Sequence, residues 1–292
     1  MKRRIPTVCQ TATNCDMAIR WLMRCATYFI VMVIAYIIID IVIKGASAIN
    51  WTFLTAMPEK GGTEGGILPA IAGTFYLILG TIAVALPLGM ASAIYLSEYA
   101  HQGRFARMLR LAIITLAGVP SIVFGLFGLG LFVLFLHFGA SILAGSLTLA
   151  CMVLPTIIVA SEEALRAVPM YLREGSLALG AGKWQTIWKN VLPYSIPGMV
   201  TGSVLGIGRA AGETAPILLT VAAFYLPRLP RSIFDQCMAL PYHLYVLATQ
   251  HPGMEKIRPM QYGTALVLVV LVLGVNLGAI ILRIHFRKKY KW

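Results

Sequence analysis

The sequence is short of charged residues, and of acidic residues above all. Only 12% of its 292 residues are charged, and it has 11 Asp and Glu against 24 Lys and Arg. A soluble domain keeps about a quarter of its residues charged. The basic residues lie between apolar runs and not on one polar face, which argues against nucleic-acid binding and is typical of a membrane protein. No polar half of the chain could form a separate soluble domain.

The sequence also has few residues that support catalysis or metal binding. Its five cysteines show neither a disulfide framework nor a metal-ligand spacing. Its five histidines are scattered along the chain. We therefore expect no metal and no cofactor, and we do not expect the chain to be an enzyme.

A phosphate-cradling loop is lacking too, although 180–183 reads Gly-Ala-Gly-Lys. Such a loop needs a glycine five residues before the Gly-Lys pair and a hydroxyl residue after the lysine. Leu177 and Trp184 occupy these positions. Any ATP hydrolysis would therefore belong to a separate partner subunit.

What the sequence does have is long apolar stretches, each able to cross about 30 Å of hydrocarbon. They cover 26–43, 68–96, 109–136, 140–160, 195–224 and 263–286. We therefore expect an all-α membrane protein with six transmembrane helices. Pro87 and Pro120 are expected kink points, and 118–121 should be a locally opened helix facing protein or a water-filled cavity.

The distribution of Lys and Arg predicts the orientation. One set of loops and both ends carry 17 of these residues, against six on the other side and one within a span. Both termini are therefore expected to be cytoplasmic. The expected organisation is a cytoplasmic tail at 1–25, a permease domain at 26–286 and a cytoplasmic tail at 287–292. Within the permease domain, 161–194 should be a cytoplasmic loop and 225–262 an extracytoplasmic segment.

Arg209 and Glu213 are the main candidate site residues, because both lie in the middle of an apolar span. Charged side chains there are costly and often functional. Their spacing of four predicts one helix face and an ion pair, and the planar arginine fork suits an oxyanion. The alternative is a structural ion pair that fixes helix register. Ser121 and Thr214 could offer hydroxyls to an anion, or bond their own helices.

The 161–194 loop reads as two short helices with a hinge at Gly180 and a stop at Leu192-Pro193. Trp184, Ile187 and Trp188 give the second helix an apolar side. That side could bind the membrane interface, bind a groove in a partner, or pack against its own bundle.

This loop resembles the signature loop of ABC importer permeases. The match rests on Glu174, on Gly180 six residues later and on Leu192-Pro193 twelve residues beyond. The family usually has two alanines after the glutamate, where this chain has Gly175 and Ser176. It usually has isoleucine three residues before the proline, where this chain has Asn190. Further segments resemble the PstA-type phosphate permeases, namely 63–66, 87–89, 95–99, 120–126 and 209–216.

The resemblance implies a MetI-like permease bundle that imports inorganic phosphate across a bacterial inner membrane by alternating access. It implies a coupling helix that docks on an ATP-binding subunit through Glu174, Gly175, Ser176, Gly180, Trp184, Leu192 and Pro193. The implied partners are a homologous second permease, an ATP-binding subunit dimer and an extracytoplasmic phosphate-binding protein. Two alternatives stay open: a proton-coupled secondary anion carrier in which Glu213 titrates, and an ABC permease for sulfate or molybdate.

Overall fold

A computed structural model describes residues 8–59, 64–101, 103–249 and 254–289. Its elements include π-helical stretches, labelled η. They are α1 (Val8–Ala46), α2 (Trp51–Thr55), β1 (Pro58–Glu59), β2 (Glu64–Gly65), α3 (Leu68–Ile94), η2 (Tyr95–Tyr99), α4 (Arg104–Ala117), α5 (Ser121–Gly128), η3 (Leu129–Phe135), α6 (Ile142–Arg166), α7 (Met170–Ala178), α8 (Lys183–Thr186), η4 (Ile187–Val191), α9 (Leu192–Gly212), α10 (Ala215–Thr220), α11 (Leu240–Thr249) and α12 (Met254–Lys289).

Five helical stretches are long and apolar enough to cross a membrane, and a bent pair can supply a sixth span. The five are Ile19–Ala46, Leu68–Tyr99, Ile142–Arg166, Lys183–Gly212 and Ile257–His285. Helices suit this setting because they satisfy their own backbone groups where no water is present. The prediction of an all-α membrane fold is confirmed. The sidedness of the termini stays a prediction.

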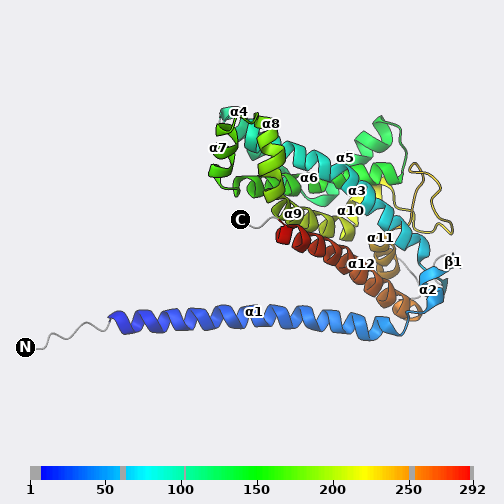
Figure 1. The fold of residues 1–292 in the computed structure, drawn as a ribbon. Helices are drawn as coiled ribbons and strands as arrows, with labels where there is room; N and C mark the ends of the chain where they lie inside the picture. Colours follow the sequence, from blue (N-terminus) through cyan, green and yellow to red (C-terminus); the bar gives the residue numbers. More distant parts are fainter. Residues whose placement is uncertain (1–7, 60–63, 102, 250–253, 290–292) are drawn as a thin grey trace, which may run out of the picture.

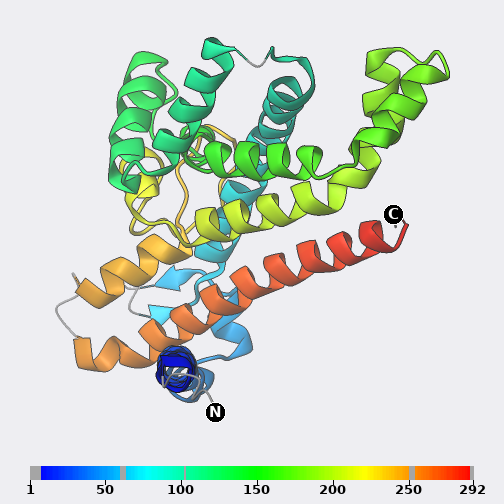
Figure 2. The same cartoon turned by 90° about the vertical axis from the view of Figure 1, so that its left-hand side faces the viewer.

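Helix α6 is the centre of the bundle, with α3 on one side and α9 on another (Figures 1 and 2). Small residues allow the close contact between α6 and α9: a Cβ atom on Gly198 would lie 2.6 Å from the Cβ of Ala164, and one on Gly206 would lie 3.4 Å from Ile157. Small-residue stripes let helix backbones approach in this way. The surface of α6 toward these helices is therefore the packed core of the protein.

The third expected span, 109–136, is not one kinked helix. Helices α4 and α5 meet at 102° across the break at 118–120. Pro120 adopts φ −57° and ψ 141°, which ends the helical path, and Ser121 opens the next helix. The expected opening of the helix at this position is confirmed, but the bend is far sharper than a proline kink, because three consecutive residues leave the helix.

Two expected helix ends are also corrected. Leu192-Pro193 does not stop the loop helix, since one helical stretch runs from Lys183 to Gly212. Pro193 is the second residue of α9, which directly follows the π-helical η4, and the helical path continues through it. The fifth span was expected to continue to 224, but α9 ends at Gly212 and the short α10 follows after two residues.

Helix α1 begins at Val8, so much of the segment expected as a tail is helical and continuous with the first span. Figure 1 shows α1 projecting from the bundle and meeting it near its C-terminal end. There the Lys44 ammonium lies 5.1 Å from the ring centroid of Tyr262 on α12. Most of the apolar surface of α1 is therefore left uncovered by this chain.

The 225–262 segment is built onto the ends of α3 and α6. The backbone N–H groups of Ile142 and Leu143 donate to the carbonyls of Asp235 and Ile233, each at 2.9 Å. The N–H of Leu240 donates to Thr74 Oγ1 at 2.8 Å. Helix α11 follows, and residues 250–253 lie outside the described part. The segment from 231 to 249 is therefore fixed to the two central helices.

Candidate functional site

Arg209 and Glu213 form the expected ion pair, but across a helix end. Arg209 lies in the last turn of α9, whereas Glu213 has φ −73° and ψ 135° and stands just outside the helix. Arg209 Nε donates to Glu213 Oε1 at 3.2 Å. The Arg209 side chain is 42% exposed and that of Glu213 is 16% exposed. The carboxylate thus binds one edge of the guanidinium, and the rest of the side chain is partly exposed.

Ser121 and Thr214 stand at the starts of two helices that pack together. Ser121 opens α5, and Thr214 precedes α10 without capping it through its side chain. A Cβ atom on Gly125 of α5 would lie 3.1 Å from the carbonyl oxygen of Ala215. Two breaks in the helical path, at 118–120 and 213–214, therefore flank one helix contact. Thr214 adjoins Glu213 in the chain, while no hydrogen bond found in the described residues links the Ser121 hydroxyl to the ion pair.

Asn276 on α12 is a polar neighbour of this region that the sequence reading missed. Gly208 directly precedes Arg209 in the chain, and a Cβ atom on Gly208 would lie 3.0 Å from Asn276 Oδ1. This oxygen is buried and has no hydrogen-bond partner among the described residues. A lone asparagine in an apolar stretch of 263–286 was the available signal, because polar side chains in spans usually face protein or a cavity.

The 161–194 loop presents a turn of two helices joined at Gly180. Gly180 has φ +83°, which favours glycine. Ser176 shares a hydrogen bond of 2.9 Å with Thr186 Oγ1, and Asn190 Nδ2 donates to Ser176 Oγ at 2.8 Å. These bonds tie α7 to α8 and η4. The hinge expected at Gly180 is therefore a tight, internally bonded corner.

The outer side of this corner is apolar and uncovered. Leu179 is 90% exposed. Trp184 and Trp188 are exposed and stack with ring centroids 5.6 Å apart. Ile187, grouped with them in the sequence reading, is instead buried. Glu174 and Gly175 are exposed on α7. The corner thus offers a protruding leucine and an indole pair to another surface.

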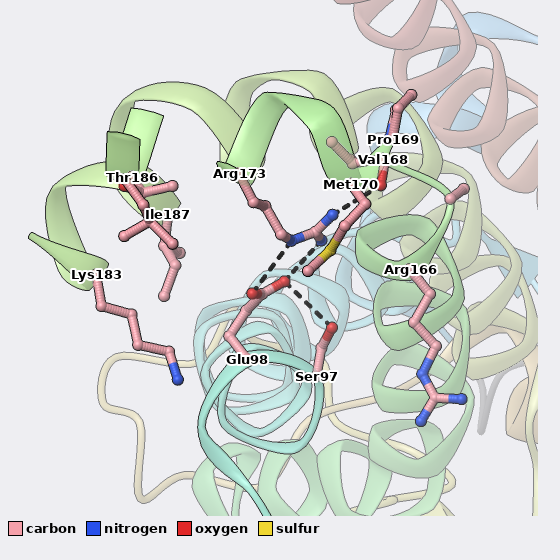
Figure 3. Close-up of a pocket in the computed structure, with 12 residues that line it drawn as sticks. Ser97, Glu98, Arg166, Val168, Pro169, Met170, Arg173, Lys183, Thr186 and Ile187 are labelled. Atoms are coloured by element: carbon pink, nitrogen blue, oxygen red, sulfur yellow. Dashed lines mark hydrogen bonds and ion pairs between the residues drawn. The ribbon is translucent and has the colours of Figure 1, made fainter. Parts of the chain in front are cut away.

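A buried ion pair anchors α7 to η2, which continues α3 (Figure 3). Arg173 Nη2 donates to Glu98 Oε1 at 2.8 Å, and Arg173 Nη1 donates to the carbonyl of Val168 at 2.7 Å. The Arg173 side chain is 13% exposed and that of Glu98 is 9% exposed. The pair borders a hollow of about 670 Å³, in which Figure 3 shows the two side chains pointing toward each other. We call Glu98 and Arg173 the clamp.

A second charged network links the neighbouring helix ends. Glu162 Oε1 accepts from Arg110 Nε and from Arg166 Nη2, each at 2.7 Å. Arg110 Nη2 also donates to the carbonyl of Leu96 at 2.9 Å. Helices α4 and α6 are thereby joined to η2 beside the clamp. The sequence reading assigned roles to none of these charged residues; Glu162 and Arg166 are only four positions apart, but Arg110 lies 52 positions from Glu162 and Arg173 lies 75 from Glu98.

The described residues thus form a membrane protein of five or six candidate spans, with broken helices, an ion pair at a helix end and a protruding helical corner. Residues 85–292 match the family model described as binding-protein-dependent transport system inner membrane component. This match covers well over half of the chain, and the chain belongs to that family.

Named relatives agree with this class. The chain is 40% identical over 230 residues to the phosphate transport system permease protein PstA 1 of Mycobacterium tuberculosis (strain ATCC 25618 / H37Rv), covering 78% of this chain and 72% of the relative. It is 35% identical over 253 residues to the probable ABC transporter permease protein YqgI of Bacillus subtilis (strain 168), covering 82% and 85%.

Solved structures share the fold at low identity. A chain of a bacterial ABC transporter involved in the import of the acidic polysaccharide alginate has a TM-score of 0.64 at 12% identity, covering 96% of this chain and 99% of that one. A chain of the MetNI methionine ABC transporter in an inward-facing conformation has a TM-score of 0.59 at 17% identity, covering 76% and 94%. The expected MetI-like importer permease fold is confirmed.

Proposed function

We propose that this chain is the permease subunit of an ATP-driven importer of inorganic phosphate. The observation that carries the proposal is the Arg209–Glu213 pair at the end of α9, beside two breaks in the helical path. A guanidinium bound on one edge by a carboxylate keeps further N–H donors for an oxyanion. The phosphate permeases among the relatives support phosphate as that anion.

Arg209 is the proposed contact for the translocating anion. Glu213 positions the guanidinium and partly offsets its charge when no anion is present. The pair is partly exposed within this chain, as expected for a surface that faces a substrate path completed by a second permease subunit. Ser121 and Thr214 are proposed hydroxyl donors at the adjoining helix starts.

The corner around Gly180 is the proposed coupling helix. Leu179 and the Trp184–Trp188 pair would enter a groove of the ATP-binding subunit, since an apolar helical edge binds a groove through such anchors. Glu174, Gly175 and Ser176 lie on the first helix of this corner, and Leu192 and Pro193 lead into α9. Movement of the docked corner would pass along the continuous helix to Arg209, giving alternating access.

The remaining assembly is proposed from the family. A homologous second permease, two ATP-binding subunits and an extracytoplasmic phosphate-binding protein would complete the importer. The chain is proposed to span a bacterial inner membrane with both of its termini in the cytoplasm. In membranes that contain this chain without the ATP-binding subunit, maleimide labelling of single cysteines placed at exposed Leu179 and Phe234 tests the orientation, since only the Leu179 position should react from the cytoplasmic side.

Competition separates phosphate from other oxyanions. In vesicles that contain the complete importer, excess unlabelled phosphate should abolish uptake of labelled phosphate, while equal sulfate or molybdate should leave it unchanged. Inhibition by sulfate or molybdate as strong as by phosphate would replace the phosphate assignment with one of these oxyanions.

A further inference from the structure

An apolar groove lies between α3 and α6, away from the proposed anion site. Its cavity has a volume of about 500 Å³, with walls formed by residues 76–84 of α3 and by the first turns of α6. Residues 230–233 of the segment after α10 close one end. The α3 wall runs through about 12 Å at 1.5 Å per residue. The groove is thus elongated, apolar and set between two membrane-spanning helices.

The closed end of the groove is a fixed turn that carries a positive charge. Asp235 Oδ2 accepts from the backbone N–H of Arg231 at 2.8 Å and of Ser232 at 3.2 Å. The Arg231 N–H bond, together with the nearby charges of Arg228 and Arg231, lowers the pKa of the Asp235 carboxyl. Asp235 therefore stays ionised while it shapes the turn. The Arg231 side chain is exposed and lines the groove, and two arginines outnumber the one carboxylate here.

The wall of the groove holds a polar atom without a partner. Ser146 is 3% exposed, and its hydroxyl makes no hydrogen bond to any described residue. A helical serine normally bonds the carbonyl four residues back, as Thr148 does to Ala144 on the same helix. Ser146 instead faces Gly80, where a Cβ atom would lie 2.8 Å from the Ser146 Cβ. Most buried hydroxyls are satisfied, whereas this one is enclosed against Gly80 and leaves an unpaired polar atom in the wall of the groove.

We propose that this groove binds one phospholipid. Its acyl chain lies along α3, and its phosphate meets Arg231 at the rim. Basic residues at the rim of a cleft between spans suit an anionic head group. Free phosphate would leave the apolar walls exposed, because it has no hydrocarbon to cover them. The lipid would hold the segment after α10 against α3 and α6.

Two substitutions test the two ends of the lipid in the complete importer. Ala83→Trp fills the groove from an exposed position on α3, and Arg231→Gln removes the charge at the rim. The matched controls are Phe75→Trp, an exposed residue of the same helix that does not line the groove, and Arg107→Gln, an exposed arginine on α4. Native mass spectrometry of the detergent-purified complex, titrated with phosphatidylglycerol, counts the bound lipid.

We expect Ala83→Trp to lose the most tightly bound lipid and Arg231→Gln to bind it about tenfold more weakly. Both controls should match the unmodified complex, and inorganic phosphate should not displace the lipid. Equal lipid binding by all variants would overturn the proposal, as would displacement by inorganic phosphate. A photoreactive side chain at position 83 that captured the second permease instead of lipid would identify the groove as a subunit interface. Arg231 is exposed, so Arg231→Gln should fold and its lipid binding tests the proposal even if Ala83→Trp does not fold.

Discussion

Asn190 donates its side-chain amide to the hydroxyl of Ser176 at 2.8 Å. These two residues are departures from the usual signature loop of ABC importer permeases, and they lie on the two arms of the corner that we propose as the coupling helix. The structure therefore shows that the departures are partners. Their hydrogen bond, together with the one between Ser176 and Thr186, holds the two arms of the corner together.

This relationship predicts coupling between substitutions at the two positions. Ser176→Ala and Asn190→Ile should each lower the thermal stability of the corner, because each leaves a polar partner unsatisfied. The double variant should be more stable than the sum of the single effects by about 1 kcal/mol. A double-mutant cycle on thermal unfolding in detergent measures this energy. Additive effects would show that the two side chains act independently.

The clamp predicts a larger effect. Arg173→Met leaves the Glu98 carboxylate buried without its partner, and breaking a buried pair in this way costs about 3–5 kcal/mol. Adding Glu98→Gln should restore part of that stability. Thermal unfolding of the purified complex measures both steps, with Glu163→Gln, an exposed carboxylate on α6, as the control for the loss of one charge. No rescue in the double variant would contradict a direct pair.

Substitution of Arg209 should impair transport even when the new residue keeps the positive charge. Arg209→Lys keeps the charge but loses the planar fork, so we expect at least a tenfold fall in phosphate uptake. The control is Arg228→Gln, an exposed arginine distant from the pair in the chain, which should keep normal uptake. Uptake kinetics with labelled phosphate are the measurement. Unchanged kinetics in Arg209→Lys would leave the pair with a structural role in helix register.

His243 predicts a pH dependence of stability. It is buried on α11, and burial lowers its pKa to about 4 from the ordinary 6.5. The unfolded chain therefore binds the proton more readily, and this residue's contribution is lost as the pH falls from 6.5 toward 4. The slope is at most about 1.4 kcal/mol per pH unit. In thermal melts, His243→Gln should flatten this slope while His101→Gln, an exposed histidine, should not. Equal slopes in both variants would refute the assignment.

Two glycines that follow the bend of the third span should differ in how substitution by alanine affects thermal stability. A Cβ atom on Gly128 would overlap the side chain of Thr148 on α6, whereas Gly130 has open space around it. Gly128→Ala should therefore lower thermal stability by about 1–3 kcal/mol, and Gly130→Ala should be neutral or stabilising. If the two variants melted alike, α5 would not pack against α6 as the structure shows.

The sequence predicted the helical class because six apolar runs carry that information locally. It also located the break at 118–120, since glycine and proline act on their own neighbourhood. It did not predict the 102° bend, which depends on the packing of Gly125 against Ala215 and of Gly128 against Thr148. It placed a stop at Pro193, although the helical path runs through this residue from Lys183 to Gly212.

Part of the candidate site could also be predicted, because it depends on residues that are close together in the sequence. Arg209 and Glu213 are four residues apart, so their pairing followed from local spacing. The partners in the clamp lie 75 positions apart, and only the fold brings them together. Nor did spacing show that Glu213 stands outside α9, although Gly212 and Pro216 are residues that commonly end a helix.

The most direct test of the central claim is the energy source of phosphate uptake. The complete importer is reconstituted in vesicles with the phosphate-binding protein on the extracytoplasmic side, and labelled phosphate is followed with ATP on the other side. We predict uptake that requires ATP and the binding protein and that persists when an ionophore collapses the proton gradient. Uptake driven by a proton gradient without ATP would contradict the account and identify the chain as a proton-coupled anion carrier.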